Sequence, residues 1–160
     1  IAQMVQDATD NFSPEYGHFK IKPHPTYSIK KVQSLLGLND TENIEFVSGD
    51  FHDVVEKSNL LISSSSSVYL ESLAKGVPVI IVGSVSGVTQ NPIPSKVASE
   101  MWCVVYNSIS LSQNIQIYKN PKINSPVMFQ ATGDKIRAEY FNPVTVGSVK
   151  SFVFGVSKGV

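Results

Sequence analysis

Five consecutive serines at positions 63–67 stand between a strand-like apolar segment and a segment with helical spacing that begins near Val68. A helix N-terminus presents unpaired backbone N–H groups and a partial positive charge, and serine hydroxyls there add donors on short side chains. A single serine in this place would need no role beyond capping the helix. Five in a row indicate a phosphate-binding turn, with Ser65, Ser66 and Ser67 as its predicted ligands.

Glu71 follows Ser67 by one helical turn. A carboxylate near a helix start is stabilised by the helix dipole whether or not it binds anything. Its paired oxygens are also suited to accept hydrogen bonds from a ribose diol. Both interpretations of Glu71 stay open on the residues alone.

The third candidate is the turn Lys22-Pro23-His24-Pro25, which follows a short extended segment. The two prolines fix the backbone on either side of His24, so the imidazole is held at the end of a predicted strand, where it could donate to a phosphate oxygen. The alternative is an ordinary surface histidine. His18 and His52 lack such a frame and are interpreted as structural, with His52 on the polar face of its helix.

Several classes of site are disfavoured by what the sequence lacks. The single cysteine, Cys103, lies in an apolar strand-like run, and neither a Cys-based zinc site nor a disulfide is expected. No histidine pair, carboxylate cluster or Gly-x-Gly-x-x-Gly motif predicts a metal or a dinucleotide cofactor. The net charge of zero predicts no binding to nucleic acid.

The sequence also bears on membrane insertion and on the cell compartment. No run approaches the ~20 apolar residues that span a bilayer, and no signal peptide is recognisable. The chain begins at Ile1 in a helical pattern, which suggests a piece of a longer protein. A cytoplasmic location is expected.

The elements that must position these residues alternate between strand-length apolar runs and helical periodicity. This alternation predicts an α/β fold with a Rossmann-like, doubly wound parallel sheet in a single domain over 1–160, with a core over 1–118 and a C-terminal helical segment over 134–158. Ligands of such sheets bind at the carboxyl ends of the strands. The predicted strands are 18–22, 44–47, 59–63, 77–82 and 102–106. The predicted helices are 1–12, 28–36 with Gly37 as C-cap, 50–57, 68–74, a short one from 95, 134–141 and 144–154. The stretch 84–94 is predicted to be a loop, and 107–132 has no assignment.

Two motifs carry a resemblance to a known family. The segment 53–62 followed by Ser66-Ser67-Val68-Tyr69-Leu70-Glu71-Ser72-Leu73-Ala74-Lys75-Gly76-Val77-Pro78-Val79-Ile80 resembles the donor-binding, C-terminal half of glycosyltransferases with the GT-B fold. The pair His24-Pro25 together with Ser66-Ser67 is similar to the paired motifs of bacterial sialyltransferases and of related capsule and surface-polysaccharide enzymes. CDP-glycerol transferases share the Ser-Ser and acidic positions. The resemblance covers Lys20 to Val82.

The resemblance implies that His24, Ser66 and Ser67 contact the phosphate and that Glu71 lies on or near the ribose of a CMP- or CDP-type donor. It also implies a glycan acceptor, and a catalytic Asp or Glu base in an N-terminal domain that has no counterpart here. A full-length form would be cytoplasmic or peripheral at the inner membrane face. Retaining members with a Glu, seven residues, Glu motif would have their first glutamate at the position of Ser63, which argues against that group.

Two alternatives remain. One is half of an enzyme similar to UDP-sugar 2-epimerases, a family that usually has Ser-Gly-Gly where this chain has serines. The other is a non-enzymatic α/β module that binds a phosphorylated ligand or a protein partner, with the loop 84–94 as a candidate surface. A preference for uridine over cytidine nucleotides would favour the first alternative.

Overall fold

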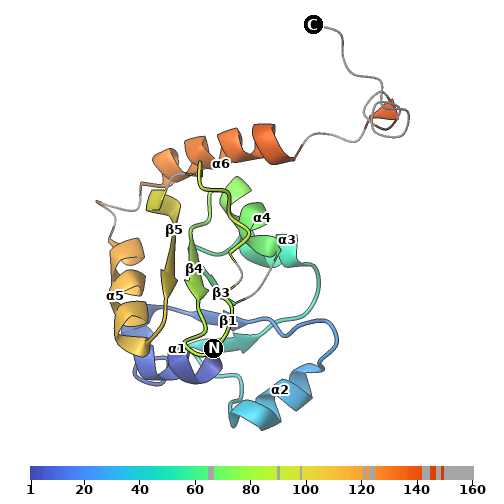
Figure 1. Cartoon of the computed structure of the whole chain (residues 1–160). Helices are drawn as coiled ribbons and strands as arrows, with labels where there is room; N and C mark the ends of the chain where they lie inside the picture. Colours follow the sequence, from blue (N-terminus) through green and yellow to red (C-terminus); the bar gives the residue numbers. More distant parts are fainter. Residues whose placement is uncertain are drawn as a thin grey trace, which may run out of the picture.

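The computed structural model describes residues 1–64, 67–89, 91–97, 99–120, 122, 125–141, 145, 146 and 149. Within these residues the chain is an α/β protein in which short parallel strands alternate with helices, as predicted (Figure 1). The helices are α1 (Ala2–Ala8), α2 (Ile29–Leu36), α3 (Phe51–Val55), α4 (Val68–Ala74), α5 (Ser108–Lys119) and α6 (Pro126–Tyr140), with short 3-10 helices η1 (Pro14–Tyr16) and η2 (Ser99–Met101).

The strands form two parallel sheets instead of the one continuous sheet that was expected. β1 (Phe19–Ile21) pairs with β2 (Ile44–Phe46), and β3 (Leu61–Ser63), β4 (Val79–Val82) and β5 (Trp102–Val105) pair in that order. All five strands fall inside the predicted ranges. Parallel pairing brings the carboxyl ends of neighbouring strands to the same edge, so the segments after β1 and β2 meet there, as do those after β3 and β4.

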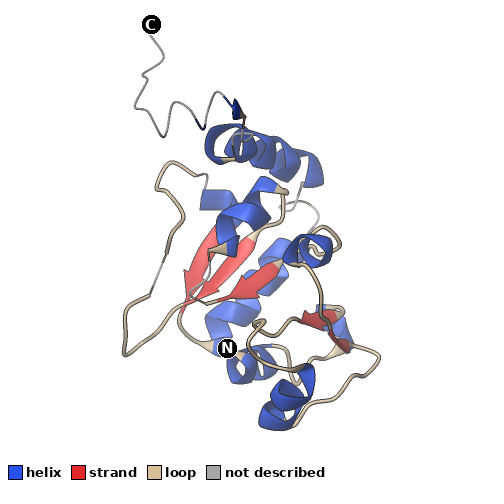
Figure 2. Ribbon diagram, turned by 90° about the vertical axis from the view of Figure 1, so that its right-hand side faces the viewer, coloured by secondary structure: helices blue, strands red, loops and turns tan. Residues whose placement is uncertain are grey.

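The central strand β4 is buried along its whole length because helices cover both faces of its sheet. α4 lies on one face and α5 on the other, and both contact β4 (Figures 1 and 2). A strand covered on both faces must be apolar throughout, which explains the unbroken run Val79–Val82. α1 packs against α5, and both sheets contribute to one hydrophobic cluster that includes Phe46, Leu73 and Ile80.

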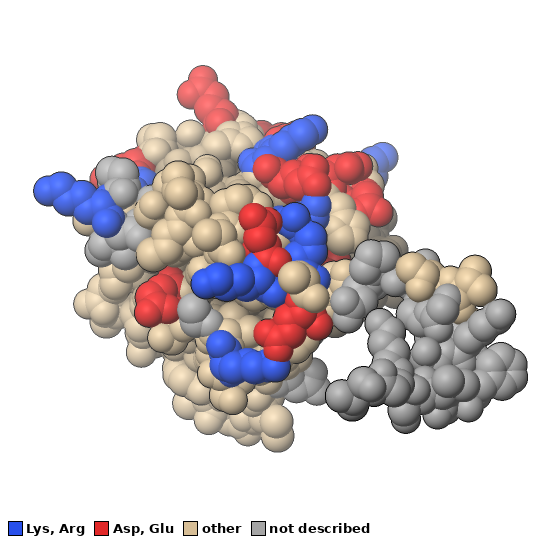
Figure 3. All heavy atoms as spheres, turned by 90° about the horizontal axis from the view of Figure 1, so that it is seen from above, with Lys and Arg blue, Asp and Glu red and all other residues tan. Residues whose placement is uncertain are grey.

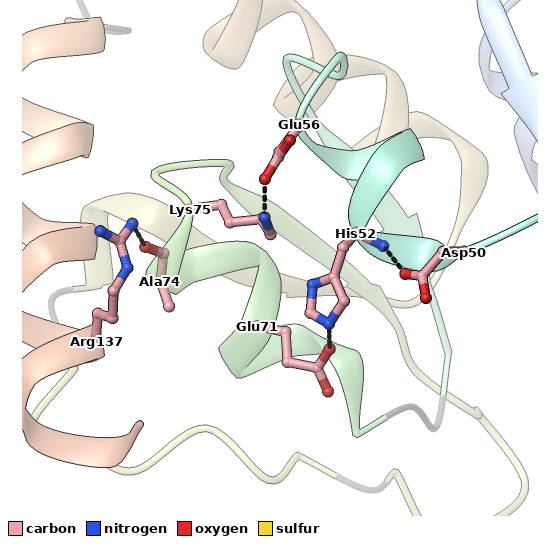
Figure 4. A network of polar contacts seen from close by, with 7 residues as sticks. All are labelled: Asp50, His52, Glu56, Glu71, Ala74, Lys75 and Arg137. Carbon is pink, nitrogen blue, oxygen red and sulfur yellow. Dashed lines mark hydrogen bonds and ion pairs between the residues drawn. The ribbon is translucent and has the colours of Figure 1, made fainter. Parts of the chain in front are cut away.

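α6 lies against α4, and a glycine permits the close approach. A Cβ atom placed on Gly133 would lie 2.7 Å from the backbone nitrogen of Gly76 and 2.8 Å from the carbonyl oxygen of Leu73. Arg137, one turn further along α6, donates from Nη2 to the carbonyl oxygen of Ala74 at 2.7 Å (Figure 4). This cation satisfies a carbonyl at the C-terminal end of α4, where the helix dipole is negative.

The sequence prediction is incomplete at the C-terminal end. The stretch 107–132, which had no assignment, contains α5 and the first turns of α6, and α6 begins at Pro126 instead of residue 134. The short helix expected from residue 95 is η2, which starts at Ser99. The predicted helix 144–154 falls largely outside the described residues. The loop 84–94 contains no helix or strand among its described residues.

The face seen from above in Figure 3 carries positive and negative side chains in close mixture. Two ion pairs lie on or beside α6: Lys96 with Glu139, and Arg137 with Asp134. Such a mixed face offers no single-signed patch to a polyanion. Within the described part of the chain, no helix is long and apolar enough to cross a bilayer.

Candidate nucleotide-binding site

A cleft of about 520 Å³ opens at the carboxyl ends of β1 and β2. Its walls are the turn that follows β1, the turn that follows β2 and the first residues of α2. The lining residues are Lys22, Pro23, His24, Pro25, Tyr27, Ser28, Ile29, Lys30, Val47, Ser48 and Gly49. The cleft therefore occupies the place where parallel α/β sheets bind ligands, and it contains the predicted residues His24 and Pro25.

The geometry of the turn orients the His24 imidazole. The Tyr27 N–H donates to the His24 carbonyl at 2.8 Å, so Pro25 occupies the second position of a tight turn, which its fixed φ suits. The Thr26 N–H donates to His24 Nδ1 at 3.3 Å, and the Thr26 hydroxyl lies 2.8 Å from the same nitrogen. Because Nδ1 accepts, Nε2 carries the proton of the neutral ring and can donate to an anion.

The charged side chains that line the cleft, Lys22 and Lys30, are both positive, and none of its lining residues is Asp or Glu. Ile29 and Lys30 are the first residues of α2, where backbone N–H groups have no acceptor within the helix. Gly49 turns the chain from the cleft into α3. Its φ of 95° is a backbone conformation that residues with a side chain rarely adopt. This arrangement can bind an anionic ligand that also has apolar or aromatic surface.

The serine turn is only partly described. Ser65 and Ser66 lie outside the described residues. Ser67 is exposed and precedes α4, but it makes no side-chain capping hydrogen bond to that helix. Ser64 lines a smaller hollow of about 260 Å³ at the carboxyl ends of β3 and β4, next to Gly83 and Ser84. The simple capping role therefore does not explain Ser67.

Glu71 contacts a residue that the sequence did not single out. Its Oε2 lies 3.5 Å from Nε2 of His52, and the two side chains are 30% and 55% exposed (Figure 4). His52 was interpreted as structural and on the polar face of its helix; it is exposed on α3, and its imidazole points toward α4. The one sequence signal for His52 was its position. It is the second residue of a helix that is capped by Asp50 and that follows a strand and Gly49.

A second contact joins the same two helices one turn further along. Lys75, which follows α4, pairs with Glu56, which follows α3. The Lys75 ammonium holds the pKa of the Glu56 carboxyl below its usual range through a hydrogen bond and through charge. Two polar pairs thus bridge α3 and α4.

The structure brings the predicted residues together in two groups. His24 and Pro25 share the cleft, while Ser67 and Glu71 share the first turns of α4, and neither of the latter lines the cleft. α3 connects the groups, because it starts directly after the turn 47–49 of the cleft and holds Glu71 through His52. Sequence reasoning missed this connection and the contribution of Lys30 and Tyr27 to the cleft.

Cys103 lies in the middle of β5 and is partly buried. Burial raises the pKa of its thiol to about 11, and a hydrogen bond from Tyr118 opposes this shift without cancelling it. The group is a thiol at neutral pH and a poor nucleophile. Among the described residues, no three His, Cys, Asp or Glu side chains gather in a way that could hold a metal ion.

No protein-family model matches this chain, and comparisons with curated proteins and with solved structures find no match either.

Proposed function

We propose that this chain is the nucleotide-sugar-binding domain of a glycosyltransferase of surface-polysaccharide biosynthesis, one half of a GT-B fold, with a CMP-linked sugar as its donor. The observation that supports this most is the cleft at the carboxyl ends of β1 and β2, lined by Lys22, His24 and Lys30. Three basic side chains and a helix start suit the phosphate of a nucleotide, and the apolar walls suit its base.

In this proposal the phosphate accepts hydrogen bonds from Nε2 of His24 and from the lysines. Tyr27, whose side chain is 50% exposed at the cleft, offers a ring face for the base. Lys31 Nζ lies over one face of that ring, 5.2 Å from its centre, so the proposed stacking of the base uses the other face. Ser65, Ser66 and Ser67 are the proposed further phosphate ligands, and Glu71 is the proposed ribose ligand.

The proposed role of this chain is to bind the donor. Transfer to a glycan acceptor needs a general base placed against the acceptor hydroxyl, and the proposal assigns that base to an N-terminal domain of the same protein. The chain by itself should therefore bind the nucleotide without transferring the sugar.

Calorimetric titration with CMP, CDP and UDP tests the proposal. Wild-type protein should bind CMP or CDP, and His24→Ala should weaken binding about ten- to a hundredfold, since a hydrogen bond to a charged group contributes about 1.5–3 kcal/mol. His18→Ala is the matched control, because His18 is an exposed histidine at the opposite end of β1.

Three other results of this titration would each lead to a different conclusion. Preference for UDP would favour the alternative of an enzyme similar to UDP-sugar 2-epimerases. Equal weakening by His24→Ala and His18→Ala would move the site away from the cleft. Absence of binding to every nucleotide would contradict the proposal and favour a non-enzymatic module.

A further inference from the structure

We infer that His52 is a positioning residue of the nucleotide site, which holds the Glu71 carboxylate in place to accept hydrogen bonds from the ribose hydroxyls. The inference rests on the proposed function and adds to it a residue that no sequence motif identifies. His52 acts through Glu71, so its effect should appear in recognition of the sugar of the nucleotide.

The contact itself engages one carboxylate oxygen, with His52 Nε2 3.5 Å from Glu71 Oε2. A carboxylate has two oxygens and several lone pairs, so this contact leaves acceptor capacity for a pair of hydroxyls. Both side chains remain open to solvent, at 55% exposure for His52 and 30% for Glu71, and a ligand can therefore reach the pair.

The position of His52 is fixed from its own side. The Asp50 carboxylate accepts a hydrogen bond of 2.7 Å from the His52 backbone N–H, which caps α3 (Figure 4). The residues just before Asp50, 47–49, line the cleft that contains His24. His52 therefore lies three residues after the cleft wall and contacts Glu71 on α4.

The pair of Glu56 with Lys75 provides a control that distinguishes positioning of Glu71 from packing of α3 against α4. Glu56 with Lys75 joins the same two elements one turn away from His52 with Glu71. Residues four apart lie on one face of a helix, so the two pairs form parallel ties. Removing the Glu56 carboxylate loosens the helices without touching Glu71, and the variant Glu56→Gln is therefore a matched control.

The test compares affinities for CMP and for 2′-deoxy-CMP, which lacks one ribose hydroxyl, in wild-type protein, Glu71→Gln, His52→Ala, His52→Gln and Glu56→Gln. Wild-type protein should favour CMP about tenfold, the effect of one hydrogen bond to a charged acceptor. Glu71→Gln and His52→Ala should each lose most of this preference, and the double variant should lose no more than either single one. His52→Gln, whose amide can donate to Glu71, should retain it, as should Glu56→Gln.

Each contrary result is specific. If His52→Ala keeps the preference while Glu71→Gln loses it, His52 does not position Glu71, and the proposed function stands. If Glu56→Gln loses the preference as fully as His52→Ala, the effect comes from helix packing and the inference fails. A wild-type protein that binds both nucleotides equally overturns the ribose role, and one that binds neither overturns the proposed function as well.

Discussion

The imidazole of His52 lies against the carboxylate of Glu71, with Nε2 3.5 Å from Oε2, and this contact joins α3 to α4. One of these helices begins at the wall of the basic cleft, and the other begins at the serine turn. The two groups of residues that the sequence predicted as one site are therefore linked by a residue that it did not predict.

Arg137→Ala should lower the free energy of unfolding by about 1–2 kcal/mol, because it removes the hydrogen bond to the Ala74 carbonyl at the end of α4. Lys135→Ala is the control, since Lys135 is exposed on the same helix. Urea denaturation of both variants measures the difference. Equal stability of the two variants would show that the Arg137 contact does not stabilise α4.

Gly133→Ala should destabilise the protein by about 1–3 kcal/mol, although alanine favours a helix by about 1 kcal/mol over glycine. The added Cβ would meet backbone atoms of Gly76 and Leu73, which cannot move as a flexible side chain can. Ala131→Gly is the control at an exposed position of α6. It should lose stability through helix propensity alone, so alanine is the more stable residue at 131 and glycine at 133. A gain of stability in Gly133→Ala would mean that α6 and α4 lie further apart.

Ser28→Ala and Ser67→Ala should differ in what they change. The Ser28 hydroxyl accepts a hydrogen bond from the Lys31 N–H, so its loss should cost about 1 kcal/mol of stability. Ser67 makes no such bond to α4, and Ser67→Ala should leave stability nearly unchanged while weakening nucleotide binding. Thermal denaturation and calorimetry on both variants distinguish the effects. A Ser67→Ala protein that loses stability but keeps affinity would assign Ser67 to capping.

Much of the fold follows from local signals in the sequence. The helix predicted over 28–36 ends at its predicted C-cap Gly37, while Ser28, predicted as its first residue, is the N-cap. β4 was predicted from its unbroken apolar run, which its burial on both faces explains. These elements were predictable because the deciding interactions are within a few residues of each other.

α5 was missed because its periodicity is confused by exposed apolar residues. Leu111, Ile115 and Tyr118 are buried and spaced as on one helix face, but Ile109 and Ile117 are exposed at 72% and 43% on other faces. The start of α6 had a usable signal, since Ser125 caps it and Pro126 occupies its first turn.

The candidate site also contains residues that local sequence predicts and residues that depend on tertiary packing. His24 at a strand end was predicted from its proline frame, and the structure places it in a cleft. The contact of His52 with Glu71 depends on how α3 packs against α4, and no local pattern in the sequence contains that relationship. Likewise, Lys30 reaches the cleft only because α2 starts beside the turns that follow β1 and β2.

The pH at which the Cys103 thiol becomes reactive should differ between the folded and the unfolded protein. In the folded protein, alkylation by iodoacetamide should rise with an inflection near pH 11, and in urea near its ordinary value of 9.0. Between these values the unfolded chain loses the thiol proton and the folded chain keeps it, so stability should fall as the pH rises across this window. The variant Cys103→Ala should lack this component. Rapid alkylation of folded protein at pH 8 would contradict the burial of the thiol.

The most direct test of the proposed nucleotide site is an NMR titration that follows the imidazole nitrogens of the three histidines as CMP is added. If the cleft binds the phosphate, His24 Nε2 should shift most, His52 should shift through its contact with Glu71, and His18 should stay unchanged. Unmoved His24 resonances at a CMP concentration that saturates binding, or equal shifts at His18 and His24, would contradict a nucleotide site in this cleft.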